Sequence, residues 1–377
     1  MKKLLCLLVA ILMVFACCSC LPSLENGESQ KKITSTDSYD ENNVDEDLYD
    51  VLLEGVSKVK KKIVIEYDCS DVLFDTYTKL LLDHPEFFWA TRGSKYSSTT
   101  KGDKITITFK PEYYMSADEV KAGKQALELK KEEILSGISS DATDYEKVLY
   151  VHDYIIDNTV YDSKSASEND GSGKKLSDSV YKSASAYGCL VEGKAICTGY
   201  TAAFQYILDA LNIESGRISG NTVGGSAVGH QWNYVSVGGE YYYIDLTWDD
   251  PVTEDGEAAR EYTYFLVGEK ELEITHIFGE GSKKLGCENK QYNYYVQQGL
   301  YVEPYDYNKV VDIISNNFSD GEVEIKFASA EDLKKATKEL FDNKKIWNIY
   351  AVKKLKLKTV YHSNSKNGLI LRITTTE

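Results

Sequence analysis

Residues 186–211 read AYGCLVEGKAICTGYTAAFQYILDAL, and this stretch decides the fold. Its second half predicts a helix, because apolar side chains at positions 204, 207, 208 and 211 recur with the spacing of one helix face. Cys197 falls at or just before the start of that helix. The free N–H groups and the dipole at a helix start favour a thiolate over a thiol. The position therefore predicts a nucleophile, whereas a cysteine buried in the middle of a helix would be inert.

Two predicted strands follow the cysteine helix. GHQWNYVSV (229–237) and EYYYIDLTW (240–248) have the composition of strands, and the two glycines between them are a hairpin signal. A two-residue turn makes His230 and Asp245 diagonal neighbours on one face of the hairpin. Cα atoms in such positions lie roughly 7–8 Å apart, within reach of an imidazole and a carboxylate. A three-residue loop would instead place the two side chains on opposite faces.

Cys197, His230 and Asp245 together predict a catalytic triad, in which the histidine moves the proton and the aspartate orients the histidine. Residues 186–200 resemble the active-site segment of the transglutaminase-like superfamily. Residues 229–233 and 243–251 resemble its histidine and aspartate segments, in the same order and spacing, and the helix around 152–161 resembles the one that precedes them. The resemblance covers about 140–280. It implies an α+β, papain-like core in which the cysteine helix packs on an antiparallel sheet.

The implied reaction is acyl transfer from a protein or peptide amide, including cell-wall peptide, through a thioester on Cys197. An amine acceptor gives cross-linking, and water gives proteolysis or deamidation; the sequence does not choose between them. Hydrolysis of a glycan-linked amide stays open by analogy with related peptide N-glycanase domains. The Cys197 backbone N–H is one expected oxyanion donor. Tyr187 and Trp232 are candidates for the second donor or for substrate contact. No metal or cofactor is expected.

A rival interpretation is a non-catalytic cell-surface protein that binds a peptide or wall polymer on the same fold. The presence of all three residues argues against this interpretation, because a member of the superfamily that only binds its ligand would be expected to lack the cysteine or the histidine. A phosphate-binding loop is excluded as well. Gly188, Gly193 and Lys194 match that motif, but Ala195 stands where a hydroxyl would hold magnesium.

The amino terminus predicts export. Lys2 and Lys3 precede an apolar run over 4–16, which is shorter than a membrane-spanning helix requires. Residues 1–20 therefore have the pattern of a signal peptide. Cys17 follows this run in a context that resembles a bacterial lipobox, and it is the predicted lipid acceptor. The expected location is the outer face of the cell membrane, with lipid-anchored attachment only. The alternative is an ordinary cleaved signal and a secreted protein.

The rest of the chain divides by composition. Residues 21–55 are acidic and poor in apolar side chains, which predicts a disordered tether. Residues 56–140 predict an amino-terminal α+β module, 141–300 the catalytic domain and 301–377 a carboxyl-terminal α+β module. Both modules are expected to follow a β-α-β-β order, with 346–350 among the extended segments of the second.

Charge and cysteine usage limit the remaining functions. The 377 residues carry a formal net charge of −16, which argues against a general nucleic-acid binder. The cysteines show neither an even disulfide framework nor zinc spacing. Cys69, Cys189 and Cys287 are expected to be packing residues, with a disulfide among them left open. His152 lies on the apolar face of its helix and is expected to be a core histidine. The oligomeric state is not indicated.

Overall fold

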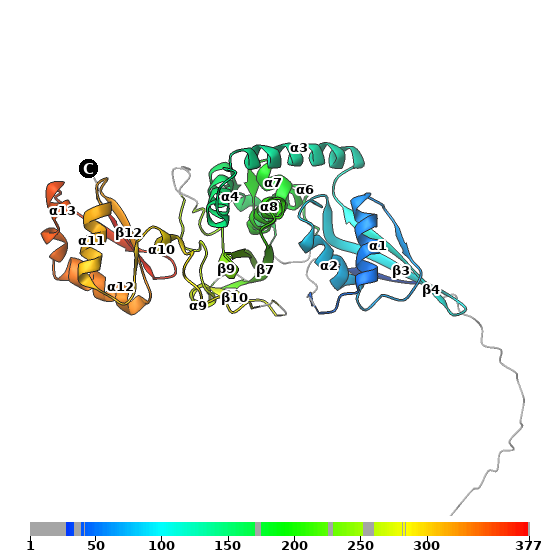
Figure 1. The fold of residues 1–377 in the computed structure, drawn as a ribbon. Helices are drawn as coiled ribbons and strands as arrows, with labels where there is room; N and C mark the ends of the chain where they lie inside the picture. The colour runs from blue at the N-terminus through cyan, green and yellow to red at the C-terminus, as the bar shows by residue number, and fades with distance from the viewer. Residues whose placement is uncertain are drawn as a thin grey trace, which may run out of the picture.

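The computed structural model describes residues 28–33, 39–40, 42–169, 175–224, 229–251, 260–280, 282 and 284–375. Three α+β units follow one another along an elongated molecule (Figure 1). Within these residues no helix combines the length and the apolar character that crossing a membrane requires. The predicted signal peptide and Cys17 lie outside the described residues.

The amino-terminal module is a four-stranded sheet with two helices. Its sheet has the order β1-β3-β4-β2, with neighbouring strands antiparallel. Its elements are β1 (Glu28–Ile33), α1 (Glu46–Ser57), β2 (Ile63–Ile65), α2 (Leu73–Asp83), β3 (Ala90–Lys101) and β4 (Lys104–Tyr113).

Helix α1 corrects the expected tether over 21–55, which is wrong for 46–55. The side chain of Asp45 caps the helix by accepting a hydrogen bond from the Leu48 N–H. Leu48, Leu52 and Val56 recur every four residues and are fully buried. The acidic residues that suggested a solvated linker stand at the helix start, where negative charge stabilises the helix. Strand β1 also lies inside the segment expected to be disordered.

Helix α3 (Ala117–Ser136) leads from this module along the outside of the central unit (Figure 1). Ser116 and Glu119 form a capping box at its start. The amino-terminal module and the central unit share one continuous hydrophobic core. The ring of Phe88 in that core stacks on Tyr187 of the central unit, with centroids 4.9 Å apart.

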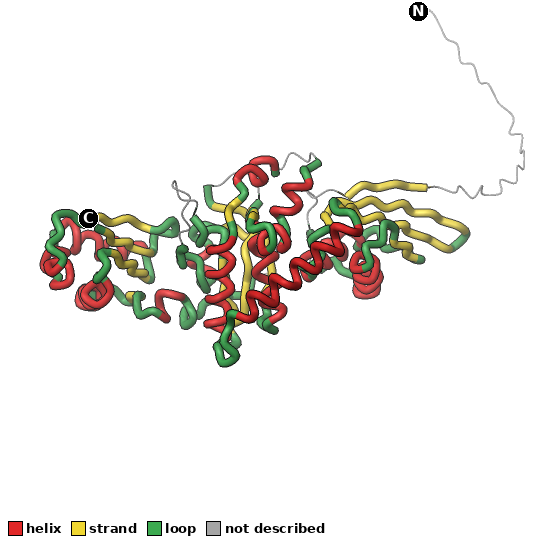
Figure 2. Tube along the Cα trace, turned by 90° about the horizontal axis from the view of Figure 1, so that it is seen from above, coloured by secondary structure: helices red, strands yellow, loops and turns green. Residues whose placement is uncertain are grey.

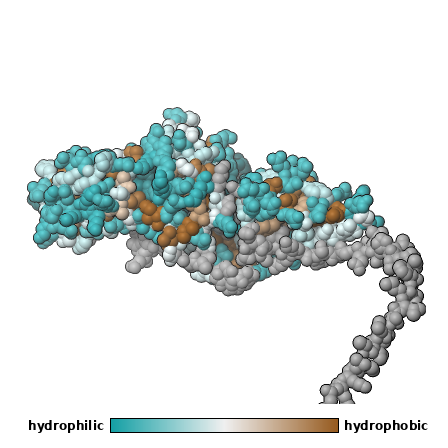
Figure 3. Space-filling view, turned by 90° about the horizontal axis from the view of Figure 1, so that it is seen from below, coloured by the Kyte–Doolittle hydropathy of each residue, from teal (hydrophilic) through white to brown (hydrophobic). Residues whose placement is uncertain are grey.

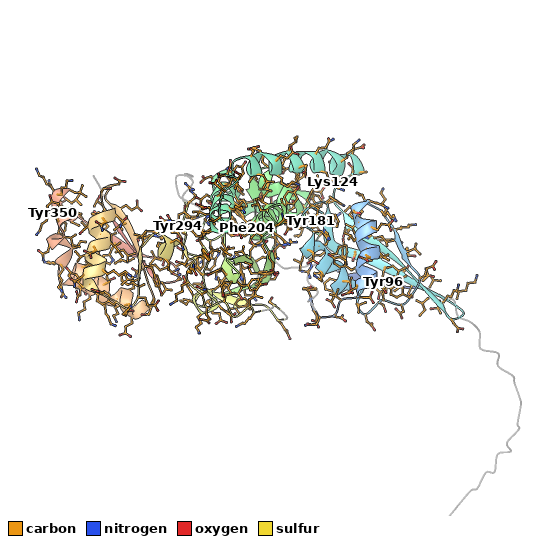
Figure 4. The ribbon with its side chains drawn as sticks, viewed as in Figure 1. Tyr96, Lys124, Tyr181, Phe204, Tyr294 and Tyr350 are labelled. Carbon is orange, nitrogen blue, oxygen red and sulfur yellow. The ribbon has the colours of Figure 1, made fainter. Side chains whose placement is uncertain are left out.

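The central unit confirms the predicted fold class. Helix α8 (Cys197–Ala210) packs on an antiparallel sheet of order β10-β7-β8-β9. Its strands are β7 (Ser215–Thr222), β8 (His230–Val237), β9 (Glu240–Ile244) and β10 (His276–Phe278). Figure 4 shows Phe204 of α8 inside this unit. The remaining elements are α4 (Asp144–Asn158), β5 (Val160–Tyr161), α5 (Ser163–Glu168), α6 (Asp178–Ser183), α7 (Ala186–Leu190), β6 (Lys194–Ala195), α9 (Glu269–Leu272) and α10 (Tyr294–Gln297).

The carboxyl-terminal module has its own hydrophobic core and a sheet of order β11-β12-β14-β13. Its elements are β11 (Tyr301–Val302), α11 (Tyr307–Asn317), β12 (Glu322–Phe327), α12 (Ala330–Thr337), a π-helix (Lys338–Asp342), a 3₁₀ helix (Lys345–Asn348), α13 (Tyr350–Lys354), β13 (Tyr361–Asn364) and β14 (Ile370–Thr374). The expectation of an extended segment at 346–350 is wrong. Ile346, Ile349 and Val352 are buried at intervals of three, a helical spacing.

The two flanking modules share one topology, visible as the strands at the two ends of Figure 2. Each begins helix, strand, helix and ends with two strands, but the second module has a π-helix, a 3₁₀ helix and α13 inserted before its last two strands. In both, the last strand lies between the other two: β3-β4-β2 in the first and β12-β14-β13 in the second. The preceding helices, α1 and α11, therefore occupy the same place in both modules.

Charged contacts fix the carboxyl-terminal module to the central unit. Arg372 of β14 lies 2.5 Å from a Glu261 oxygen and 2.5 Å from a Glu324 oxygen. Lys326 of β12 is buried and lies 2.5 Å from Glu271 of the central unit. On the face seen in Figure 3, the carboxyl-terminal module is mostly hydrophilic, and apolar residues gather beside it on the central unit.

Candidate active site

Cys197 is the first residue of α8, as the sequence predicted, and its side chain is partly exposed. The residue before it, Ile196, is the N-cap and supplies no side-chain hydrogen bond to the helix start. The first hydrogen bond of the helix is the one that the Gly199 N–H donates to the Ile196 carbonyl at 2.8 Å, so the N–H groups of Cys197 and Thr198 precede the hydrogen-bonded turns. They are available to an anion next to the sulfur.

The hairpin has the predicted two-residue turn. Gly238 and Gly239 take φ angles of 63° and 83°, which residues with a side chain rarely adopt. The pairing of β8 with β9 runs from Val237 opposite Glu240 to Asn233 opposite Ile244. His230 is consequently the first residue of β8, and Asp245 follows the last residue of β9.

His230 and Asp245 meet as this register requires. Nε2 of His230 lies 2.7 Å from Oδ2 of Asp245. Burial favours the neutral imidazole, but the charge of Asp245 and its hydrogen bond outweigh burial and raise the pKa of His230 to about 10. Asp245 is buried as well, yet His230 and His276 hold the pKa of its carboxyl well below the usual range.

The nearby Cys197 also favours the protonated ring of His230 and helps to raise its pKa. Since Nε2 of His230 is engaged by Asp245, Nδ1 is the ring nitrogen left for the sulfur. The structure thus brings the three predicted residues together as thiol, imidazole and carboxylate, in that order.

His276 belongs to the same network, and the sequence analysis left it unassigned. Its Nε2 lies 3.0 Å from Oδ2 of Asp245, and its Nδ1 lies 2.9 Å from the Thr275 hydroxyl. The other oxygen, Oδ1 of Asp245, accepts from the backbone N–H groups of Thr247 and Trp248. Among the described residues, His230, Asp245 and His276 are the group close enough to hold a metal ion. Both oxygens of Asp245 are already engaged, Oδ2 by the two histidine rings and Oδ1 by the two backbone N–H groups.

Trp248 covers His230. Its ring stacks on His230 with centroids 5.5 Å apart and lies 4.5 Å from the ring of His276. Tyr161 of β5 is a second neighbour of the site. It pairs with Ala195, two residues before Cys197, and burial and the nearby Cys197 both raise the pKa of its phenol. Neither residue had been assigned a role from sequence, although both lie inside the quoted motifs.

Tyr187 and Trp232, the residues expected to supply an oxyanion donor or a substrate contact, both pack against other aromatic rings. Trp232 has no exposed surface, and its indole Nε1 is buried without a hydrogen-bond partner. Its ring packs edge-on against His276 below the site. Tyr187 is partly exposed, but its ring stacks on Phe88 of the amino-terminal module.

His152 is a core histidine, as expected. It is fully buried on α4, with its ring nitrogens 3.0 Å from Asp153 and 3.4 Å from Asp249. Burial raises the pKa of Asp249 to about 7. This pair ties α4 to the segment that follows Asp245 and contributes to the support of the site.

The remaining cysteines of the described residues do not form disulfides with one another. Cys69, Cys189 and Cys287 are free and buried, in agreement with a packing role. The Cys189 sulfur lies 3.3 Å from the Thr159 hydroxyl.

Comparison with known proteins defines the class of the central unit. Residues 132–246 match the sequence model of the transglutaminase-like superfamily. This part of the chain is a transglutaminase-like domain, and its α+β fold carries the cysteine helix and the hairpin described above. No curated protein sequence matches the chain.

Three solved structures show a distant similarity. A transglutaminase is 13% identical over 40% of this chain and 43% of its own, with a TM-score of 0.30. A proposed cysteine protease from Cytophaga hutchinsonii is 14% identical over 63% of this chain and 71% of its own, with a TM-score of 0.25. A proposed protease from Parabacteroides distasonis is 10% identical over 44% of this chain and 40% of its own, with a TM-score of 0.23. The match therefore spans less than half the length of the first and third of these proteins.

Proposed function

We propose that this protein is a cysteine enzyme of the cell surface that transfers the acyl group of a protein or peptide amide through a thioester on Cys197. The observation that carries the proposal is the 2.7 Å contact of His230 with Asp245 on the hairpin that faces the start of α8. The transglutaminase-like domain at 132–246 supports the cysteine chemistry.

The proposed steps use three side chains. At neutral pH the proton of the Cys197 thiol already resides on His230, in keeping with the raised pKa of that imidazole, and the sulfur attacks the amide carbonyl carbon. The N–H groups at the start of α8 stabilise the oxyanion. His230 then gives its proton to the departing amine, which leaves Cys197 bound to the acyl group as a thioester.

The acceptor closes the cycle. Water, deprotonated by His230, hydrolyses the thioester and releases an acid, whereas an amine forms a new amide. Asp245 remains ionised throughout and holds the imidazole with Nδ1 toward the sulfur. Both outcomes share the same acyl-enzyme, so one set of variants tests both.

The direct test compares wild type with Cys197→Ala. Wild type should react with iodoacetamide at a neutral pH where an ordinary thiol is slow, and it should release a reporter amine from quenched casein peptides or incorporate an amine probe into them. Both signals should disappear in Cys197→Ala. Cys69→Ala, which removes a buried thiol in the amino-terminal module, is the matched control and should retain them. Turnover that survives the loss of Cys197 would refute the enzyme proposal.

The location has a separate test. Lipidation at Cys17 predicts that a labelled fatty acid is incorporated into wild type and that the protein fractionates with membranes. Cys17→Ser should lose the label and appear in the medium or the soluble fraction. Equal labelling of both proteins would contradict the proposed anchor.

A further inference from the structure

The carboxyl-terminal module reaches the catalytic histidine through a single side chain. Nζ of Lys366, in the turn between β13 and β14, lies 3.0 Å from the centroid of the Trp248 ring. The same ring stacks on His230. A cation from a separate module therefore stands one aromatic ring away from the catalytic imidazole.

The turn that carries Lys366 is firmly held. Its neighbours Ser365 and Asn367 are both buried, although Lys366 itself is exposed. The Ser365 hydroxyl donates to Oδ1 of Asn367 at 2.6 Å, and Nδ2 of Asn367 donates to Glu271 of the central unit at 3.1 Å. Because both flanking residues are fixed, the amine is placed at the site before any ligand binds, which reduces the entropic cost of binding.

Lys366 differs from the other lysines near this boundary. Lys326 pairs with Glu271, and Lys290 pairs with Glu303. Within the described part of the chain, the contact that the Lys366 amine makes is with the face of the Trp248 ring. Burial lowers the pKa of this amine, and the negative charge of Asp245 opposes the shift.

An ammonium group has three N–H donors, and an aromatic face does not satisfy them as a carboxylate would. A cation–π contact at an exposed site is weaker than a charge-assisted hydrogen bond to a carboxylate. The protein as a whole is strongly acidic, with a net charge of −16, and would repel an acidic peptide. The cation of Lys366 over the Trp248 ring offsets this repulsion next to His230.

We infer that Lys366 forms a subsite that binds a carboxylate of the substrate next to the scissile amide. This inference rests on the proposed function and narrows its substrate class to peptides with an acidic side chain or a free carboxyl terminus near the reacting bond. The carboxylate lies beside the Trp248 ring and accepts hydrogen bonds from the Lys366 amine that stands over that ring. The carboxyl-terminal module then contributes to specificity and does not take part in the chemistry.

The experiment uses one quenched peptide sequence in which Glu, Gln or Lys occupies each position beside the scissile amide, with the carboxyl terminus either free or amidated. Wild type is compared with Lys366→Met and Lys366→Glu. Lys358→Met, an exposed lysine of the same module, is the matched control. Lys366→Met should raise KM for the preferred acidic peptide about tenfold, the size of one charge-assisted hydrogen bond, with kcat retained and the Gln peptide unaffected. Lys366→Glu should transfer the preference to the Lys peptide.

The peptide set identifies the source of the carboxylate. A Lys366-dependent preference for Glu over Gln assigns a side chain, and a preference for the free over the amidated terminus assigns the terminal group. An equal change in KM for charged and neutral peptides would overturn the inference. A rise in activity toward all peptides would overturn it too, because the turn would then only obstruct the site.

A binding measurement separates this inference from the proposed chemistry. Fluorescein-labelled forms of the same peptides are titrated into Cys197→Ala, with and without Lys366→Met, and followed by anisotropy. Acidic peptides should bind about tenfold more weakly to the double variant. If wild-type turnover does not need Cys197 but this Lys366-dependent difference is present, the proposed function fails and the carboxylate subsite stands. If acidic peptides show no such difference, or none binds, the subsite fails whatever the turnover.

Discussion

Oδ2 of Asp245 lies 2.7 Å from Nε2 of His230, which is the first residue of β8, and Asp245 directly follows β9 of the same hairpin. A slip of this hairpin by one residue would turn one side chain to the opposite face of the sheet. The geometry of the His230–Asp245 pair therefore depends on the strand register, and the register depends on the two-residue turn at 238–239.

Removing the charge of Asp245 is expected to change the pH range of activity. Its charge and hydrogen bond hold the pKa of His230 at about 10, so the imidazolium persists to alkaline pH. In Asp245→Asn the backbone N–H groups of Thr247 and Trp248 keep the amide oxygen in the place of Oδ1. The NH2 group therefore faces Nε2 of His230, the charge is gone and the pKa of His230 falls. The alkaline limb of kcat/KM for peptide turnover should therefore move from near pH 10 toward neutrality. Asp245→Ala loses the orientation as well, and its kcat should fall about 10²–10⁴-fold. An unchanged alkaline limb in Asp245→Asn would contradict this assignment.

The same pair predicts how stability depends on pH. The folded pKa of His230, about 10, lies above its ordinary value of about 6.5, so its stabilisation is complete below pH 6.5 and is lost as the pH rises through 10. The pKa of Asp245 is depressed in the folded state, so its contribution is present above about pH 4 and is lost in acid. The difference in unfolding free energy between wild type and Asp245→Asn should be largest near pH 5–6 and smallest near pH 10. Urea titrations at these pH values measure the difference in unfolding free energy. A difference that grows toward pH 10 would contradict the raised pKa of His230.

His276 is expected to act as a positioning residue through Asp245. His276→Phe removes a donor from a buried carboxylate, which should cost about 1–3 kcal/mol of unfolding free energy. It should also lower kcat by less than Asp245→Ala does, with KM unchanged. His276→Gln places an N–H donor close to the original Nε2 and should recover part of the kcat, whereas a purely structural role would leave kcat the same in both variants once they are folded.

The sequence predicted the parts of the site that depend on residues close to one another along the chain. Cys197 at a helix start and His230 opposite Asp245 follow from a helical repeat and from the length of one turn. Both are set by fewer than about 20 consecutive residues, so local patterns carry the information.

The parts that the sequence did not predict depend on long-range pairing or on context. His276 reaches Asp245 because β10 pairs with β7, and no local signal reports the strand order of the sheet. Lys366 arrives from a module that begins more than 50 residues after Asp245 in the chain. Helix α1 was missed because acidic residues are typical both of a helix start and of a solvated linker. The spacing of Leu48, Leu52 and Val56, which is that of one buried helix face, is what distinguishes the two.

The turn itself can be tested by a matched pair of substitutions. Gly239 has a φ of 83° and open space where a Cβ would stand. Gly239→Ala should therefore cost about 1–2 kcal/mol through backbone strain alone, and Gly239→Asn should cost less because asparagine tolerates this conformation. Gly238→Ala adds a collision with the Tyr292 ring at 2.6 Å and should cost more than either. Equal unfolding free energies for all three variants would show that the two-residue turn does not determine the register.

The folding of α1 is tested by two adjacent side chains. Leu52 is fully buried, whereas Val51 is 36% exposed. Leu52→Ala should cost about 2–5 kcal/mol of unfolding free energy, and Val51→Ala should stay within about 0.5 kcal/mol. If residues 46–55 were a disordered tether, both changes would be neutral. Because α1 belongs to the same hydrophobic core as α8, Leu52→Ala should also lower the temperature at which Cys197 becomes reactive to iodoacetamide. Loss of thiol protection and loss of secondary structure should then coincide in a single thermal transition, whereas an independently folding amino-terminal module would give two.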